Sequence, residues 1–276
     1  MSPVRSIATA TLLSVLSMPG LAAAQDAAPT TPAVIPAAAE PTADWDMVRD
    51  PRKKMVAAYV SLDSGVSVIL RCSDGVYDAL VSGLPEAPRR DTRVLRISYD
   101  DHFHAETWNV ATVRSTALSA LPAPFARKLR EGGKVSIVVP DGAGPGRNLR
   151  HDLELPRSST AVDETLTACN RPLVDPRDSA LPDLDEYGQS PSVTWARPPR
   201  PAYPFPAKYT AGFAMLSCMA LPDGRLDACL VESEFPVDGG FGRQALKSTD
   251  DARLQSPDGA PVSPRLVVFR TNFMMR

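Results

Sequence analysis

The chain has 276 residues, of which 43% are hydrophobic, and its 30 basic and 32 acidic residues give a formal net charge of −2. This near balance gives no electrostatic reason to expect nucleic acid or an anionic membrane surface as a partner. The hydrophobic content is sufficient for packed cores, and the length favours two small domains over one large domain.

The first 24 residues have the pattern of a secretory signal peptide. One basic residue, Arg5, precedes an apolar run over residues 7–16, and three alanines end the segment before Gln25. The run is shorter than the roughly 20 residues of a spanning helix, so the pattern favours cleavage after Ala24. We therefore expect export to the periplasm, with no stable membrane insertion after cleavage. Residues 25–43, rich in Ala and Pro, are expected to form a disordered leader.

Residues 45–178 are predicted to form a mainly-β domain. Short β-branched and aromatic runs, separated by turn residues such as Asp74-Gly75, are typical of strands. The predicted strands cover residues 55–62, 66–72, 76–81, 94–99, 107–113, 135–139 and 149–153. Two helices are also expected, one over 124–131 that stops at two glycines, and one that begins at 158–159. The second helix places Cys169 on its apolar face.

Residues 179–206 are rich in proline and are interpreted as an interdomain linker. The second domain, 207–276, follows. Apolar runs at 213–221 and 226–232 flank Asp223-Gly224, which predicts a hairpin. A helix over 241–254 and a strand over 265–273 complete a small β-β-α-β domain. The chain as a whole is therefore predicted to be α+β with two domains.

The four cysteines are predicted to form two disulfides. An even number of cysteines in an exported chain favours disulfide bridges. The sequence contains no C-x-x-C motif, so the spacing typical of a zinc ribbon is missing. With Asp223-Gly224 in the turn, Cys218 faces Cys229 across the hairpin at a separation that a disulfide tolerates. Cys72 is then left to bond Cys169.

The last third of the chain resembles the C-terminal domain of TonB-family energy transducers, over about residues 198–276. The landmarks that carry this resemblance occur in the family's order: Ala202-Tyr203-Pro204, Ala207, Gly212, Asp223-Gly224, Ser233, Phe241, Ala245-Leu246, Gly259-Ala260-Pro261-Val262 and Phe273. The resemblance implies that an extended segment of an outer-membrane or other envelope protein adds as a strand to an open sheet edge. The implied edge consists of Arg265, Val267, Val268, Phe269, Arg270, Thr271 and Phe273, with Tyr203 and Pro204 nearby. The two arginines would discourage unwanted edge pairing.

The chain also departs from the family's pattern. An energy transducer needs a membrane anchor, whereas this chain is expected to lose its only candidate, and it lacks the family's long Pro/Lys spacer. Leu254-Gln255 replaces the aromatic residue usual at the helix exit. We therefore expect a non-enzymatic periplasmic adaptor without a cofactor. A membrane-anchored energy transducer is the alternative if the N-terminal segment is retained.

A metal- or ligand-binding role is the second alternative. His102 and His104 would share one face of a strand, and His151 could add a third imidazole to a zinc site. A solvated, polar strand end is the favoured interpretation of these histidines. The sequence contains none of the G-x-S-x-G, S-x-x-K or H-E-x-x-H motifs, so no catalytic residue is predicted.

Overall fold

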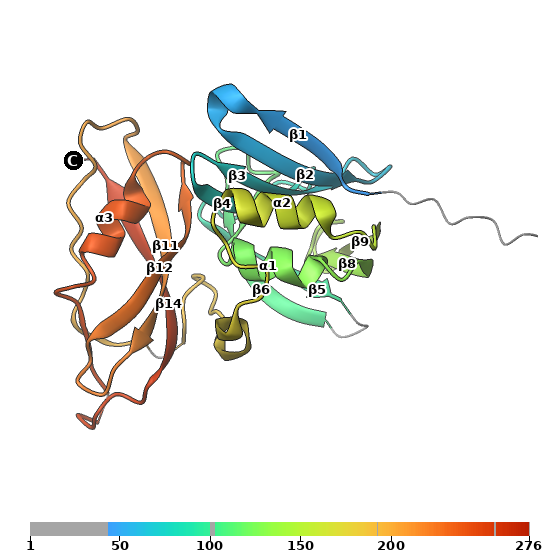
Figure 1. The fold of residues 1–276 in the computed structure, drawn as a ribbon. Coiled ribbons are helices and arrows are strands. Elements are labelled where there is room, and N and C mark those ends of the chain that lie inside the picture. Colours follow the sequence, from blue (N-terminus) through green and yellow to red (C-terminus); the bar gives the residue numbers. More distant parts are fainter. Residues whose placement is uncertain (1–43, 100–102, 192, 257, 276) are drawn as a thin grey trace, which may run out of the picture. The chain divides into compact units, whose positions relative to one another are not determined.

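The computed structural model describes residues 44–99, 103–191, 193–256 and 258–275. The predicted signal peptide and leader lie outside this part of the chain. The described residues are α+β, with strands in three sheets and three α-helices (Figure 1).

The larger sheet has nine antiparallel strands in the order β1-β2-β3-β4-β7-β6-β5-β8-β9. Its strands are β1 (Asp46–Asp50), β2 (Met55–Ser61), β3 (Ser67–Ser73), β4 (Val76–Ser82), β5 (Thr92–Ser98), β6 (Phe103–Val110), β7 (Ala117–Ser119), β8 (Gly133–Val139) and β9 (Leu149–Leu155). Seven of them overlap predicted strands, although β6 begins four residues before the predicted strand over 107–113 and ends three residues earlier. The other two, β1 and β7, were not predicted, because β1 is largely charged and β7 is only three residues long.

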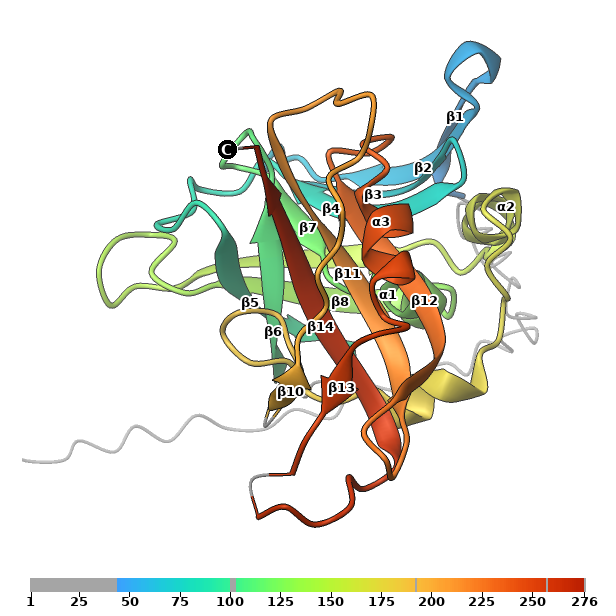
Figure 2. The same cartoon turned by 90° about the vertical axis from the view of Figure 1, so that its left-hand side faces the viewer.

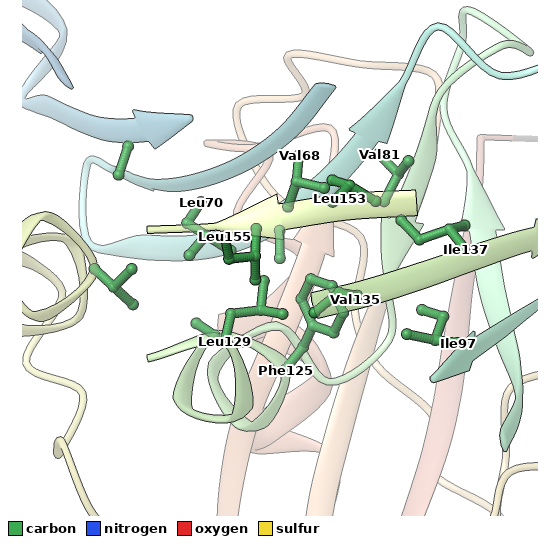
Figure 3. Close-up of a cluster of buried hydrophobic side chains, with 14 of the residues drawn as sticks. Val68, Leu70, Val81, Ile97, Phe125, Leu129, Val135, Ile137, Leu153 and Leu155 are labelled. Atoms are coloured by element: carbon green, nitrogen blue, oxygen red, sulfur yellow. The ribbon is translucent and has the colours of Figure 1, made fainter. Parts of the chain in front are cut away.

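Helices α1 (Pro122–Leu129) and α2 (Thr160–Ala168) bury their apolar sides against this sheet. Their residues join strand residues in one continuous core, part of which is drawn in Figure 3; it includes Leu70, Ile97, Phe125, Ile137 and Leu153. A short 3-10 helix, η1 (Pro51–Lys53), connects β1 to β2. The predicted disulfide between Cys72 and Cys169 is present and joins β3 to the end of α2, with 5.5 Å between the Cα atoms.

The second large element is a three-stranded antiparallel sheet in the order β12-β11-β14. It consists of β11 (Ala211–Ala220), β12 (Leu226–Phe235) and β14 (Arg265–Met274). Helix α3 (Phe241–Lys247) covers one face, where Phe241 and Ala245 pack against Val267 and Phe269. A small two-stranded sheet pairs β10 (Trp195–Arg197) with β13 (Arg253–Leu254).

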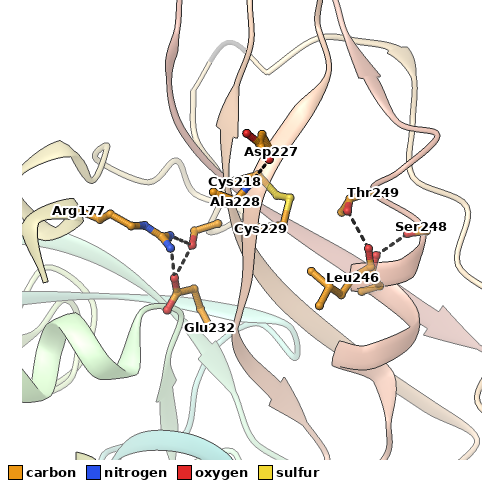
Figure 4. The surroundings of a disulfide bond; sticks show 11 residues. Arg177, Cys218, Asp227, Ala228, Cys229, Glu232, Leu246, Ser248 and Thr249 are labelled. Atoms are coloured by element: carbon orange, nitrogen blue, oxygen red, sulfur yellow. Dashed lines mark hydrogen bonds and ion pairs between the residues drawn. A yellow bond between two sulfur atoms is a disulfide. The ribbon is translucent and has the colours of Figure 1, made fainter. Parts of the chain in front are cut away.

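The helix predicted over 241–254 is too long, because α3 ends at Lys247. The hydroxyl groups of Ser248 and Thr249 donate hydrogen bonds to the main-chain oxygens of Ala245 and Leu246, at 2.7 Å each (Figure 4). Such side chains compete with main-chain hydrogen bonds and favour helix ends. The residues that follow leave the helix and form β13.

The hairpin between β11 and β12 contains the predicted disulfide in a different register. A two-residue turn of Asp223 and Gly224, as predicted, would place Pro222 opposite Arg225. Leu221 faces Arg225 instead, with 2.9 Å between the Leu221 nitrogen and the Arg225 oxygen. The pairing shifts by one residue beside Ala228, whose φ is +46°. This bulge brings Cys218 opposite Cys229, with 4.1 Å between their Cα atoms (Figure 4). The pairing is confirmed, but the two-residue turn from which it was predicted is wrong.

The described residues belong to one compact unit, in which the two large sheets share a hydrophobic cluster. This cluster contains Leu118 and Ala120 from the β7 region together with Phe213, Met215 and Val268 from the smaller sheet. The segment predicted as a linker includes the last two residues of the 3-10 helix η2 (Pro176–Ala180) and all of β10. It also packs against strands, since the Thr107 hydroxyl donates to the main-chain oxygen of Asp185 at 2.6 Å.

Candidate functional site

The predicted partner-binding edge lies on β14, an outer strand of the three-stranded sheet. Its ten residues pair with β11 from Ala220↔Arg265 to Ala211↔Met274. On its other side no described strand pairs with it. The strand is long because its β-branched and aromatic residues suit a pleated sheet with buried faces.

Residues on β14 alternate between two roles. Val267, Phe269 and Phe273 point into the core beneath α3, and Thr271 shares their face and is buried. In an antiparallel strand, the main-chain groups of successive residues also alternate between the two neighbours. The N–H and C=O of Val268 point away from β11, since both bond to Ser190. On β14, the N–H and C=O groups of even-numbered residues therefore point away from β11, and we call these the outward main-chain groups.

The expectation that this edge is open at Val268 is wrong. Ser190 donates its N–H to the Val268 oxygen at 2.7 Å, and the Val268 N–H donates to the Ser190 Oγ at 2.6 Å. Further along the same segment, Trp195 packs edge-on against Phe269, with 5.2 Å between the rings. Figure 2 shows β10 and β13 beside β14. The proline-rich segment therefore covers the edge at Val268.

The end of β14 presents a different surface. Asn272 is exposed, and 76% of Met274 is exposed. No hydrogen bond from another described residue reaches the outward main-chain groups of Asn272. We call residues 270–274 of β14 the free edge.

Arg270 is a fixed residue at the start of the free edge. Its guanidinium donates to the Asn109 Oδ1 at 2.8 Å and to the Asn272 Oδ1 at 2.8 Å, and it lies 4.0 Å from the centre of the Phe213 ring. Burial lowers the pKa of Arg270 to about 10. Arg270 therefore anchors β14 to β6. Arg265, at the other end of the strand, is exposed.

Tyr203 and Pro204 lie on the α3 side of the sheet. The Tyr203 ring packs edge-on against Phe241 and Phe273, at 6.0 Å and 6.2 Å between ring centres, and its hydroxyl donates to the Tyr209 oxygen at 2.7 Å. Pro204 is buried next to Gly240. These two residues support the strand from its buried face and do not line its free edge.

The structure does not bring the candidate metal ligands together. His104 on β6 faces Ile97 on β5, Ile97 faces Ile137 on β8, and Ile137 faces His151 on β9. The two histidines are thus separated by three strand spacings, about 14 Å. His102 lies outside the described residues. Among the residues that are described, no group of three or more His, Cys, Asp or Glu could hold a metal ion.

Sequence reasoning missed Ser190 and Asn272, which decide where the edge is covered and where it is free. Neither residue belongs to a motif, and a serine in a proline-rich segment carries no local signal for a contact 78 residues away.

Comparisons with known proteins give no further assignment: no protein-family model matches the chain, and no curated protein matches it. Within the described ranges, no helix is both long enough and apolar enough to cross a membrane. The candidate site therefore depends on the geometry of β14.

Proposed function

We propose that this chain is a non-enzymatic periplasmic adaptor that binds an extended segment of an envelope protein at the free edge of β14. The observation that carries the proposal is the exposed end of this outer strand, where the main chain of Asn272 has no partner among the described residues. A segment that adds as a fourth strand would bond to these groups, and its side chains would supply selectivity.

The sequence landmarks that resemble TonB C-terminal domains support this binding mode. One of them has a clear structural role, because a Cβ atom on Gly212 would lie 2.2 Å from the Phe241 ring. Glycine at this position lets Phe241 pack directly on β11 and hold α3 against the sheet that carries β14. Transmission of force to a receptor is not part of the proposal, since force requires an anchor.

The size of the free edge limits the affinity. Each net hydrogen bond contributes about 1 kcal/mol, so the two to four bonds that residues 272–274 can offer correspond to weak binding, with a dissociation constant of about 1 mM or higher. Tighter binding would require the partner's side chains to contact the surface, or Ser190 to release Val268 and lengthen the edge. We therefore expect a transient complex.

A photo-cross-linking residue at Met274 of the full-length protein, in cells, tests the proposal. Cross-linked envelope segments are identified, synthesised as peptides and titrated against purified protein. Asn272→Pro removes an outward N–H without removing a bond to β11, so we expect at least fivefold weaker peptide binding. Asn272→Ala keeps this N–H and is the matched control. Equal binding by the two variants would contradict strand addition.

The two disulfides support export to an oxidising compartment. If the first 24 residues act as a signal peptide, the periplasmic fraction should contain protein that begins at Gln25. N-terminal sequencing checks this; a retained N-terminus would instead favour a membrane-anchored transducer.

A further inference from the structure

A second feature of the fold is a cavity of about 200 Å³ beside β6. It exists because β7 ends at Ser119, so that β6 has no described strand neighbour on this side over residues 104–107. Helix α1 and residues 181–184 close the space instead. The cavity belongs to the larger sheet and is separate from the free edge of β14.

The Glu106 carboxylate is the main polar group of this cavity. The Trp108 Nε1 donates to one of its oxygens at 3.3 Å, and the Tyr99 hydroxyl donates to the other at 3.4 Å. Both distances exceed the usual values of about 2.9 Å for N–H donors and 2.8 Å for O–H donors. The carboxylate thus retains unused capacity to accept hydrogen bonds. Burial raises the pKa of Glu106, which indicates that its charge is poorly solvated.

Aromatic rings surround this carboxylate. Trp108 packs edge-on against Phe125 at 5.0 Å, and Tyr99 does so at 6.4 Å. At the exposed side of the cavity, the Lys128 ammonium lies 5.2 Å from the centre of the Tyr99 ring. A partly buried carboxylate whose hydrogen-bond partners are the neutral N–H and O–H groups of Trp108 and Tyr99 favours a cation over an anion or a neutral group.

We propose that this cavity binds a small primary amine whose ammonium group pairs with Glu106 and whose apolar body lies against Trp108 and Phe125. A cavity of about 150 Å³ binds benzene, so a body about the size of one aromatic ring fits here. An anion is disfavoured because the described groups that donate hydrogen bonds to Glu106 are the neutral Tyr99 hydroxyl and Trp108 N–H. These donors do not neutralise the carboxylate, so its negative charge faces the cavity.

Titration of the full-length protein with benzylamine, followed by calorimetry and by NMR shifts of the Trp108 indole, tests the proposal. Benzyl alcohol has nearly the same shape without the charge and is the matched control ligand. We expect saturable binding of benzylamine and at least about tenfold weaker binding of benzyl alcohol. Equal binding of both would contradict the pairing with Glu106, and so would no binding of either.

Two variants give effects of opposite sign. Glu106→Gln removes the charge and keeps the shape, so benzylamine binding should weaken at least about tenfold. Lys128→Ala removes a positive charge from the cavity entrance, so benzylamine binding should strengthen by a few-fold. If Lys128→Ala weakens binding, or if phenylacetate binds better than benzylamine, the cavity takes an anion and the proposal is wrong.

Binding should also depend on pH. The titratable groups around the cavity besides Glu106 and Tyr99 are Lys128 on α1, His104 on β6, Asp178 on η2 and Asp183 on the segment that closes the cavity; Asp178 is already bonded to Arg127. Because the amine needs the Glu106 carboxylate, its affinity should fall as the pH drops through the raised pKa of Glu106. Glu106→Gln should lose this dependence, and an unchanged profile in that variant would contradict the assignment.

Discussion

At the scale of single residues, Glu232 shows how a buried charge joins two parts of the chain. Its side chain on β12 is 6% exposed and lies 3.5 Å from the Arg177 guanidinium, which belongs to η2. Ser217 on β11 donates to Glu232 and accepts from Arg177, so the three side chains form a closed network (Figure 4). The carboxylate is satisfied only as long as η2 stays against the sheet.

Removing the cation should therefore destabilise the protein strongly. Arg177→Met leaves Glu232 buried without its positive partner, and we expect the free energy of unfolding in urea to fall by about 3 kcal/mol. The double variant Arg177→Met/Glu232→Gln removes both charges and should recover most of this loss. A loss below about 1 kcal/mol for the single variant would mean that Glu232 is solvated.

At the scale of elements, the β3–β4 hairpin and the β11–β12 hairpin each have a glycine with positive φ in the turn, but the two glycines have different neighbours. Gly75, between β3 and β4, has a φ of +81°, and Gly224, between β11 and β12, has a φ of +78°. A Cβ atom on Gly75 would meet nothing within 4 Å, whereas one on Gly224 would lie 2.2 Å from the Leu254 oxygen. Gly224 is also bonded to β13, since the Leu254 N–H donates to its oxygen at 2.8 Å. No neighbouring atom therefore crowds the Cβ position of Gly75, whereas docking of β13 adds a steric constraint at Gly224.

Alanine substitutions should separate these two constraints. Gly75→Ala places a Cβ in left-handed backbone and should cost about 1 kcal/mol of unfolding free energy. Gly224→Ala adds a clash with main-chain atoms and should cost about 1–3 kcal/mol more. Chemical denaturation of both variants, with the disulfides oxidised, measures the difference. Equal losses would show that β13 moves away at little cost.

At the scale of the whole molecule, the two large sheets are expected to unfold together. Met215 and Val268, both fully buried, belong to the cluster that the smaller sheet shares with Leu118 and Ala120. Arg171 strengthens this connection by donating to the Val231 oxygen at the edge of β12. Unfolding one sheet alone would expose this cluster, which is unfavourable.

Calorimetry checks this coupling. We expect one heat-absorption peak for the oxidised full-length protein, with equal calorimetric and van't Hoff enthalpies. In Gly224→Ala, the whole peak should shift to lower temperature, because the altered hairpin lies in the same cooperative unit. Two separate peaks, with only one shifted by the substitution, would instead support two independently folding domains.

Local features of this protein could be predicted from its residues. Alternating β-branched residues marked seven of the nine strands in the larger sheet, and Asp74-Gly75 and Asp223-Gly224 marked two hairpins. The Cys218–Cys229 pairing was also predictable, because the two cysteines lie on the two arms of one hairpin, 11 residues apart. In these cases the interacting residues are close in sequence, so a short segment carries the whole signal. The Cys72–Cys169 bond spans 97 residues and was predicted only because no other cysteines remained.

Features that depend on contacts between distant residues could not be predicted in this way. β4 pairs with β7 and β5 pairs with β8, so that the sheet order separates His104 from His151 and leaves the Glu106 cavity where β7 ends. Ser190 covers β14 at Val268 from 78 residues away. These arrangements follow from burying whole faces of sheets at once, which no local pattern specifies.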